Sequence, residues 1–584
     1  MVKYTNSDID GRITEYENKL QELKTAFLAG VTLETELIVI RMMNVVDVIG
    51  RPPPVVITVR CSQMGNTAET IVLNDMPYAF GARYAKEKCC LPGTRESVLG
   101  EICDVLNNPA EDAPRVCLLT GVAGSGKSAV AHTIARLYDG QERLGSSYCF
   151  ASTDVARRNP QNFFSTIARD LCGHDPQYES ALWEIVKGNR ALRTSTSPSE
   201  QVERLIIEPS ARLHAIGPLV VVVDALDESG NADDRQQLLD ALSRHIADGK
   251  LPTNLRFLIA TRPENDILNA LPSGPQVVRI HLGDVPEAVI DEDIEKFIHH
   301  SLHQYTELDS SWPNGDWRRL LVQHSQHLFQ WASAACKFIR GSSANGLDLC
   351  EWLQILLKSN NSGGVQPPLD RLYRTILEQQ FPLHVAQRQF HDVMAVVLAL
   401  SEPLSLASLT VLFRGGLKVR DIIEPLGSLL DGAHDEDKPI WPLHTSFRDF
   451  LLDEARSSSF HIQILPQHSL ILRGALLACM RDLLKFNICD LKDSRLRNTA
   501  VPDLIHQVNK AIPHHLSYAC QYWMDHLQHA NFTPELLKEV TLFFKDFFPY
   551  WVEAISLLSL SSPLSPILSA TETCTLLETW AKVR

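Results

Sequence analysis

The stretch Gly121-Val-Ala-Gly-Ser-Gly-Lys127-Ser128 decides the fold of this chain. It matches G-x-x-x-x-G-K-[ST], the P-loop, in which successive backbone N–H groups hold phosphate oxygens. The residues before it, 116–120, are typical of a short buried strand, and the residues after it, 129–135, are typical of a helix. A plain glycine turn between a strand and a helix is the competing interpretation. The four fixed positions and both flanks favour the phosphate-binding loop.

The residue types of this loop suit a nucleotide and a magnesium ion. Gly124 and Gly126 lack a Cβ, so backbone N–H groups can approach phosphate oxygens at the start of a helix, where the dipole favours anions. Lys127 can reach the β- and γ-phosphates, and the hydroxyl of Ser128 can ligate Mg²⁺. We therefore expect ATP or ADP with Mg²⁺ here. The predicted nucleotide contacts are Gly121, Ala123, Gly124, Ser125, Gly126, Lys127, Ser128 and Ala129.

Length and composition bound the class of protein. The 584 residues suggest about four domains, and 45% hydrophobic residues suffice for several cores. A net charge of −15 argues against a general nucleic-acid binder, which would present a basic face. No apolar run is long enough to span a membrane, and the N-terminus does not resemble a signal peptide. The 13 cysteines show no C-x-x-C spacing, so we expect reduced thiols in a cytoplasmic protein.

Residues from about 90 to 282 alternate between strand and helix patterns. Beyond the strand before the P-loop, short apolar runs at 147–151, 219–223, 256–260 and 277–282 are typical of strands buried on both faces. This alternation predicts an α/β P-loop NTPase domain, with a parallel sheet between helices. Ligands on such sheets bind at the carboxyl ends of the strands.

An acid cluster, Asp224-Ala-Leu-Asp227-Glu228, follows the run at 219–223. Asp224 is predicted to hold Mg²⁺ opposite Ser128. Either Asp227 or Glu228 can orient or deprotonate an attacking water, and the sequence leaves that choice open. Acids that merely complement a helix dipole are the competing interpretation.

Thr261-Arg262-Pro263-Glu264 follows the run at 256–260. An arginine at this strand end would face the γ-phosphate and could sense its presence. A surface arginine beside a turn proline is the alternative. Asp227, Glu228 and Arg262 are thus the predicted catalytic residues.

The three motifs together resemble a NACHT domain, the signal-transduction ATPase (STAND) class that includes Nod-like receptors and nephrocystin-like P-loop domains. The fungal branch is most similar, because its Cys-Leu-Pro-Gly-Thr-Arg, Thr-Ile-Ala and Leu-Tyr-x-x-Ile-Leu motifs have counterparts at 90–95, 166–168 and 372–377. The resemblance covers roughly residues 85 to 530. Relatives usually carry Ala-Gly-Gly where this chain has Ser325-Gln-His327, which puts the start of the next helix in doubt.

The resemblance also implies a domain order for a mostly α-helical chain. Small helical and winged-helix domains would follow the P-loop domain, and an all-α region would end the chain. The predicted boundaries are 1–54 for an N-terminal helical segment, 55–89 for a linker, 90–285 for the NACHT P-loop domain, 286–380 for the small helical domain, 381–460 for the winged-helix domain and 461–584 for the C-terminal helical domain.

His444, in Leu443-His444-Thr-Ser-Phe-Arg-Asp-Phe450, is the last candidate. In the family, the histidine of His-x-Ser-Phe donates a hydrogen bond to the β-phosphate of ADP and latches the resting state. An imidazole suits this role because it can donate to phosphate and its charge is tunable near neutral pH. From the residues alone, a packed core histidine is the alternative.

Both ends of the chain leave alternatives open. Apolar spacing over 13–48 predicts a helix that packs on its own domain or docks to a partner. The aromatic cluster between Phe543 and Trp551 is predicted to pack a helical core, and a partner groove is the minority interpretation. We find no repeat of the kind that relatives use as sensors. Either the chain lacks such a sensor, or it is a short or truncated form.

The sequence therefore predicts an ADP-latched switch that opens with ATP, self-associates as a homo-oligomer, hydrolyses ATP slowly, and acts on an unknown protein effector or sensor. A housekeeping P-loop kinase and a scaffold that binds nucleotide without hydrolysing it are the alternatives.

Overall fold

The computed structural model describes residue 73 and residues 76–558, except 111, 153, 214–216, 305–315, 342–350, 352, 357–365, 414–417, 465–475, 492–500, 502, 531 and 532. All of these belong to one compact unit, Leu73–Arg584. The predicted N-terminal helix, most of the predicted linker and the last part of the C-terminal region lie outside the described residues.

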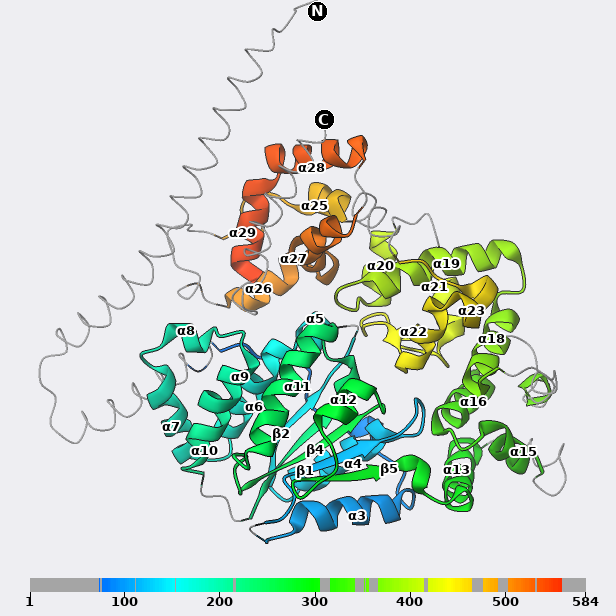
Figure 1. Cartoon of the computed structure of the whole chain (residues 1–584). Helices are drawn as coiled ribbons and strands as arrows, with labels where there is room; N and C mark the ends of the chain where they lie inside the picture. The colour runs from blue at the N-terminus through cyan, green and yellow to red at the C-terminus, as the bar shows by residue number, and fades with distance from the viewer. Residues whose placement is uncertain are drawn as a thin grey trace, which may run out of the picture. The chain divides into compact units, whose positions relative to one another are not determined.

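A five-stranded parallel sheet carries the P-loop (Figure 1). Its strands are β1 (Val116–Thr120), β2 (Leu144–Cys149), β3 (Leu219–Asp224), β4 (Leu255–Thr261) and β5 (Val277–His281). The order β2-β3-β4-β1-β5 places β4 between the P-loop strand and the strand that ends in Asp224. Thr261 is therefore paired beside Thr120, and the residue after it reaches the same sheet edge as the P-loop.

Every residue of β1, β3 and β4 is buried, as expected for central parallel strands covered on both faces. Helices α3 (Glu96–Asn107) and α4 (Lys127–Asp139) share one apolar cluster with the sheet. The other helices of this region are α5 (Val155–Arg158), α6 (Phe163–Cys172), α7 (Pro176–Val186), α8 (Arg190–Arg193), α9 (Pro198–Gln201), α10 (Glu208–Ser210), α11 (Ala232–Ala247) and α12 (Asn265–Ala270). The predicted α/β P-loop NTPase fold is confirmed.

The chain then becomes helical. Its next helices are α13 (Glu287–Leu302), α15 (Asp316–Ser325), α16 (Phe329–Gly341) and α18 (Pro368–Gln380). Trp317 and Trp331 are fully buried in their common core. Large buried aromatic side chains of this kind contribute much of the apolar area that holds short helices together.

The sequence Ser325-Gln-His327, where relatives usually carry Ala-Gly-Gly, places non-glycine residues in a left-handed backbone conformation. Gln326 and His327 adopt φ values of 47° and 64°, in the left-handed region that favours glycine. The pair of glycines expected from the resemblance would avoid this strain. His327 Nδ1 lies 2.8 Å from Asp291 Oδ1, a contact that offsets part of the cost. Helix α16 nevertheless begins at Phe329, directly after this turn.

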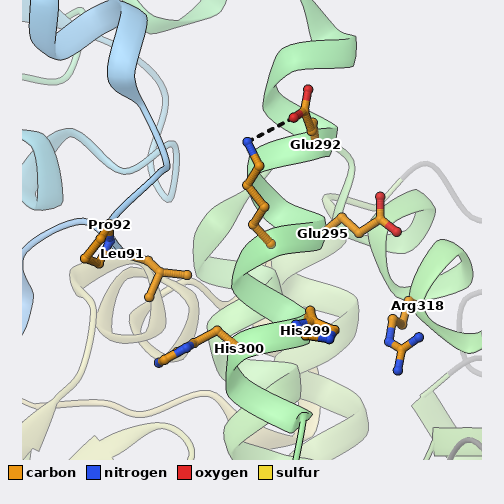
Figure 2. A pocket seen from close by; sticks show the side chains of 8 residues that line it. Leu91, Pro92, Glu292, Glu295, His299, His300 and Arg318 are labelled. Atoms are coloured by element: carbon orange, nitrogen blue, oxygen red, sulfur yellow. Dashed lines mark ion pairs between the residues drawn. The ribbon is translucent and has the colours of Figure 1, made fainter.

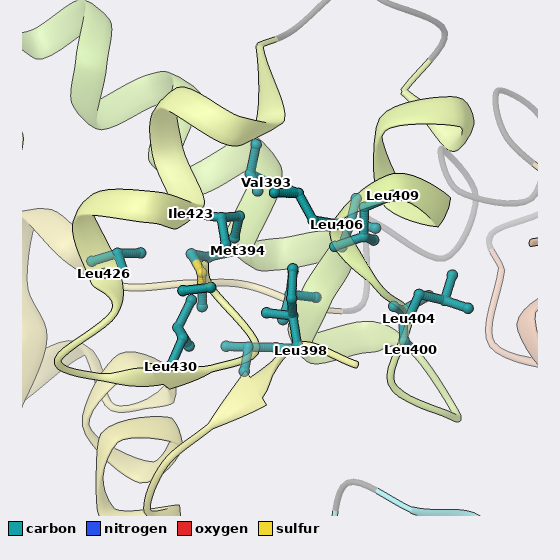
Figure 3. Close-up of a cluster of buried hydrophobic side chains, with 14 of the residues drawn as sticks. Val393, Met394, Leu398, Leu400, Leu404, Leu406, Leu409, Ile423, Leu426 and Leu430 are labelled. Atoms are coloured by element: carbon teal, nitrogen blue, oxygen red, sulfur yellow. The ribbon is translucent and has the colours of Figure 1, made fainter. Parts of the chain in front are cut away.

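Figure 3 shows a second packing centre, where Val393, Met394 and Leu398 meet leucines and isoleucines of later elements. The elements here are α19 (His384–Ala399), α20 (Leu406–Leu412), α21 (Val419–Ile423), β6 (Leu430–Asp431), β7 (Trp441–Pro442), α22 (Thr445–Leu452) and α23 (Glu454–Ser457). Strands β6 and β7 pair antiparallel and form a short hairpin. The winged-helix assignment and all domain boundaries stay predictions.

The C-terminal region is built from helices alone over the residues that the structure describes. They are α25 (Leu477–Leu483), α26 (Leu504–Ala511), α27 (His514–Gln528), α28 (Pro534–Asp546) and α29 (Phe548–Leu558). Phe543 lies 4.8 Å from Trp523 between ring centroids, and Trp551 Nε1 donates to Cys520 O at 2.8 Å. Phe543 and Trp551 therefore pack a helical core, as predicted.

The expectations about membrane spans and cysteines can be compared with all the residues that the structure describes. Among the described residues, we find no helix with the length and apolar character needed to cross a bilayer. The cysteines described by the structure are all free thiols.

Candidate nucleotide-binding site

The P-loop joins β1 to α4 with a backbone that only glycine adopts readily. Gly124 and Gly126 have φ values of 82° and 98°. Helix α4 begins at Lys127, and no side chain of the described residues caps its first turn. Its first N–H groups thus lack a side-chain acceptor at the positive end of the helix dipole, an arrangement that fits an anionic phosphate.

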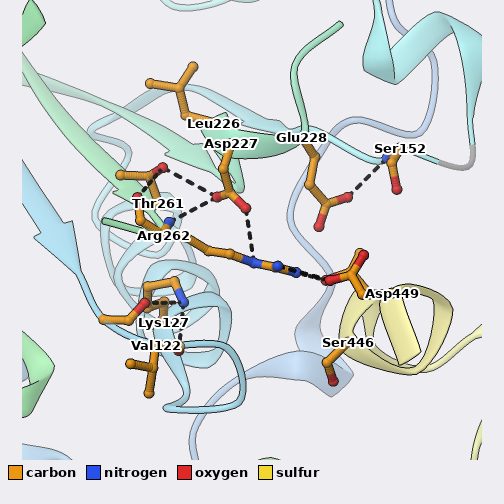
Figure 4. A network of polar contacts seen from close by, with 12 residues as sticks. Val122, Lys127, Ser152, Leu226, Asp227, Glu228, Thr261, Arg262, Ser446 and Asp449 are labelled. Atoms are coloured by element: carbon orange, nitrogen blue, oxygen red, sulfur yellow. Dashed lines mark hydrogen bonds and ion pairs between the residues drawn. The ribbon is translucent and has the colours of Figure 1, made fainter. Parts of the chain in front are cut away.

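Lys127 is the buried cation of this loop, with 9% of its surface exposed. Its ammonium donates to Gly121 O at 2.9 Å and to Val122 O at 3.0 Å (Figure 4). Burial lowers the pKa of Lys127, while the nearby carboxylates of Asp227 and Asp224 oppose that shift.

Helix α16 lies directly on the P-loop. Gln330 N donates to Gly124 O at 3.1 Å, and a Cβ built on Gly124 would lie 2.9 Å from Gln330 Cβ. The Cβ built on Gly124 would also lie 3.2 Å from Leu369 Cδ1, in α18. The loop is thus in contact with the helical region as well as with the sheet.

This contact gives a stability prediction. Gly124→Ala places a side chain at φ 82°, at a cost of about 1–2 kcal/mol, and also forces α16 to shift. We expect the midpoint of thermal unfolding to fall by several degrees. Gly100→Ala in α3 is the matched control: its Cβ meets no atom within 4 Å, so stability should stay equal or rise slightly. Equal midpoints for both variants would contradict the tight contact.

Arg95 is a site residue that the sequence marked only as part of a family motif. It is 3% exposed, its Nη2 donates to Ser125 O at 2.7 Å, and its guanidinium lies 4.7 Å from the ring centroid of Phe329. Among the residues that the structure describes, its Nε and Nη1 have no hydrogen-bond partner. Buried donors without acceptors are costly, so this cation beside the P-loop fits an oxygen- or nitrogen-rich ligand. The sequence signal that could have identified Arg95 is its position directly before the first residue of α3.

Ser128 and Asp224, the predicted magnesium ligands, lie together. Ser128 Oγ donates to Asp224 Oδ1 at 3.1 Å, although the two residues come from α4 and β3. Asp224 is 5% exposed; burial raises its pKa, and the hydrogen bond from Ser128 lowers it. Hydroxyl and carboxylate oxygens are the donors that Mg²⁺ prefers, so the pair fits this ion.

His132 and Cys149 lie behind Asp224 and were missed by the sequence analysis. His132 Nε2 is 3.8 Å from Asp224 Oδ2 and 4.0 Å from Cys149 Sγ. His132 Nδ1 accepts from Ala85 N at 3.0 Å, which leaves the ring proton on Nε2. Burial lowers the pKa of His132 to about 4 and raises that of Cys149 to about 12. The proton on His132 Nε2 places a donor beside the Asp224 carboxylate.

Asp227 is fully engaged by the end of β4. Its Oδ1 accepts from Arg262 N at 2.9 Å and from Thr261 Oγ1 at 3.2 Å, and its Oδ2 lies 3.2 Å from Arg262 Nε. These contacts fix the strand end and the base of the Arg262 side chain. Asp227 thus holds an arginine in place (Figure 4).

Arg262 continues from Asp227 to helix α22. Its Nη1 lies 2.9 Å from Asp449 Oδ2, and its Nη2 donates to Thr445 Oγ1 at 2.9 Å. Burial lowers the pKa of Arg262, whereas the carboxylates of Asp449 and Asp227 raise it. Their effect is larger than that of burial, so the net shift is upward. The alternative of a solvated surface arginine does not describe this side chain, whose exposed fraction is 25%.

Glu228 has a different environment from Asp227. Its Oε2 accepts from Ser152 N at 2.9 Å, in the loop after β2. Burial raises the pKa of Glu228 to about 7, and the hydrogen bond from Ser152 opposes that shift. A carboxyl with a pKa near 7 is matched to proton transfer at neutral pH.

His444 lies at the N-terminus of α22. Its Nδ1 accepts from Ser446 N at 3.1 Å, so the ring proton lies on Nε2, and Tyr373 OH is 2.8 Å from Ser446 Oγ. Burial, followed by the charges of Arg262 and Lys127, lowers the pKa of His444 to about 3. The imidazole is therefore neutral near pH 7 and lies within the field of both site cations.

A surface hollow of about 540 Å³ lies elsewhere, on α13 (Figure 2). Its lining combines Leu91 and Pro92 with polar side chains of both signs, and Lys296 is paired with Glu292 at 2.9 Å. None of the predicted site residues lines it.

Residues 93–262 match the family described as Nephrocystin 3, N-terminal. The matched segment contains Arg95, the P-loop and the acid cluster, and it ends at Arg262. The NACHT assignment and the fungal branch stay predictions. A search of curated proteins found no match.

The solved structures that the chain matches include a STAND protein with a tetratricopeptide repeat sensor from Pyrococcus horikoshii. It is 12% identical with a TM-score of 0.38, over 82% of this chain and 59% of that protein. The chain thus spans about 59% of the length of that relative. A Walker-type ATPase of Pyrococcus abyssi is 13% identical with a TM-score of 0.30, over 64% of this chain and 99% of the other.

Proposed function

We propose that the chain is a nucleotide-operated switch of the STAND class. Its resting form would bind ADP with α22 held against the P-loop domain, and its ATP form would open and self-associate as a homo-oligomer. The observation that carries this proposal is the path from Asp227 through Arg262 to Asp449 and Thr445. It joins an acid of the nucleotide site to a helix of the predicted winged-helix domain.

The proposed ligand contacts follow from the residues at the sheet edge. The P-loop N–H groups and Lys127 would bind the phosphates, and the unpaired donors of Arg95 would bind another polar part of the nucleotide. Ser128 and Asp224 would hold Mg²⁺. The ion would neutralise negative charge on the phosphates.

Hydrolysis in this proposal needs a base, and Glu228 is the better candidate. Both oxygens of Asp227 are committed to Arg262 and Thr261. Among the described residues, Glu228 accepts a hydrogen bond only through Oε2, from Ser152 N, which leaves Oε1 for a water. A carboxyl with a pKa of about 7 can take a proton from water at neutral pH. Asp227 then acts as a positioning residue for Arg262.

His444 is proposed as the latch on ADP. Its Nδ1 is occupied by Ser446 N, so Nε2 is the ring donor available to a phosphate oxygen. A neutral imidazole can still donate, so the low pKa does not disqualify it. The proposal also includes the predicted domain boundaries and a cytoplasmic location. It further includes an unknown effector or sensor partner and a lack of nucleic-acid binding.

The test is the nucleotide that stays bound during purification, identified by chromatography after denaturation. We expect near-stoichiometric ADP in the wild-type protein. His444→Ala should release ADP about tenfold faster or more, because a hydrogen bond to a charged group contributes about 1.5–3 kcal/mol. His384→Ala, an exposed histidine at the start of α19, is the control. A nucleotide-free wild-type protein would argue against the latched switch, and unchanged release from His444→Ala would remove the latch role.

A further inference from the structure

The guanidinium of Arg262 is occupied on all three nitrogens by protein oxygens. Nε lies 3.2 Å from Asp227 Oδ2, Nη1 lies 2.9 Å from Asp449 Oδ2, and Nη2 donates to Thr445 Oγ1 at 2.9 Å. Figure 4 shows the side chain extended between the acid cluster and helix α22. Two of the three partners thus come from α22.

Arg262 occupies a place where a third phosphate would seek a cation. It follows β4, the strand between the P-loop strand and the strand of Asp224. Burial lowers the pKa of Lys127, and the charge of Arg262 adds to that shift. A P-loop lysine reaches the β- and γ-phosphates, and arginines at such sites neutralise the terminal one.

We infer that Asp449 determines nucleotide specificity: its carboxylate makes the closed arrangement accept a nucleoside diphosphate and disfavour a triphosphate. This inference rests on the proposed function, and it assigns a role to a residue of the stretch 443–450 other than the latch histidine. Asp449 supplies to Arg262 the negative charge that a terminal phosphate would otherwise supply.

The physical argument is competition and repulsion. A triphosphate that bound while α22 stayed in place would bring further negative charge toward the Asp449 carboxylate, and like charges repel. A triphosphate that captured Arg262 would instead break the contacts to Asp449 and Thr445. A diphosphate does neither. Differential affinity of this kind couples the third phosphate to release of α22.

The charge of Asp449, rather than its packing, carries the effect. Its side chain is 36% exposed, so it fills no core position. The hydroxyl of Thr445 is neutral, so it adds no repulsion between a triphosphate and α22. Removing the charge while keeping the shape should therefore change the preference between nucleotides more than it changes the fold.

The experiment measures Kd for ADP and for the slowly hydrolysed analogue ATPγS, each with Mg²⁺, by titration calorimetry on the full chain. In Asp449→Asn the ratio Kd(ATPγS)/Kd(ADP) should fall roughly tenfold, within the usual range of coupling between sites. Asp449→Glu keeps the charge and should keep the wild-type ratio. Asp437→Asn, on the exposed connection between β6 and β7, makes the same change in net charge away from Arg262 and should also keep it.

Asp449→Ser is a second uncharged variant, for use if Asp449→Asn does not fold. Uncharged variants that bind both nucleotides with the wild-type ratio would overturn the inference and leave the switch itself standing. Uncharged variants that weaken both nucleotides alike would also overturn it, because the carboxylate would then only support the fold. A wild-type protein that binds neither nucleotide would instead refute the proposed function.

Discussion

Replacing Lys127 with alanine is expected to lower the affinity for ADP and for ATP by about a hundredfold or more. Lys127 is the buried cation of the P-loop, and removing one partner of a buried charge pair costs about 2–5 kcal/mol. The loss should be similar for both nucleotides, because both carry the β-phosphate that the lysine can reach. Titration calorimetry with each nucleotide and Mg²⁺ measures it.

The control separates binding from folding. Lys187→Ala removes an exposed lysine directly after α7 and should leave both affinities unchanged. The Lys187 ammonium lies 2.6 Å from Glu184 Oε2, a surface ion pair of small energetic weight. Far-ultraviolet circular dichroism should show the same helical content for both variants. Tight nucleotide binding by a folded Lys127→Ala variant would refute the proposed site at the P-loop.

The sequence predicted the fold of the P-loop region well, for a physical reason. Strands buried on both faces need continuous apolar runs, and the runs at 219–223 and 256–260 lie inside β3 (Leu219–Asp224) and β4 (Leu255–Thr261). Strand order was not predictable in this way. The position of β4 between β1 and β3 depends on packing between distant segments, and this order brings the end of β4 beside the P-loop.

The site was predictable where a motif fixes local geometry, and not where side chains meet across the chain. Sequence alone left Asp227 and Glu228 equivalent, whereas the structure ties Asp227 to Arg262 and Glu228 to Ser152. Asp449 is 187 residues from Arg262, on a helix whose pattern indicates only that it is amphipathic. No local rule predicts such a contact, because it depends on where α22 packs.

The second large effect concerns the proposed base. Glu228→Gln should lower the rate of single-turnover ATP hydrolysis about a hundredfold or more, the usual contribution of a general base, with little change in Kd for ATP. The amide keeps the shape and can still accept from Ser152 N, but it cannot take a proton from water. Phosphate release from a pre-formed complex measures the rate.

Asp227→Asn is the matched comparison. It removes the charge that holds Arg262, so it should alter the relative affinity for ATP and ADP in addition to the rate. A fall in rate confined to Asp227→Asn would transfer the base role to that residue. Unchanged hydrolysis in a protein with both substitutions would favour a scaffold that uses nucleotide only for structure.

The pH dependence tests the same carboxyl independently of catalysis. Burial raises the pKa of Glu228 from 4.5 to about 7, so between these values the folded protein holds a proton that the unfolded chain has lost. The stabilising contribution of that proton is therefore present at low pH and is lost as pH rises through about 7. Glu228→Gln removes this dependence, so its thermal midpoint should exceed that of the wild-type protein at pH 8 and approach it at pH 5.5.

The rate of hydrolysis gives a second pH test. Wild-type hydrolysis should rise with pH over the same range, because only the deprotonated carboxylate can act as the base. A stability difference that stayed constant between these two pH values would show that Glu228 does not titrate there, and a general base at neutral pH would then have to be sought elsewhere.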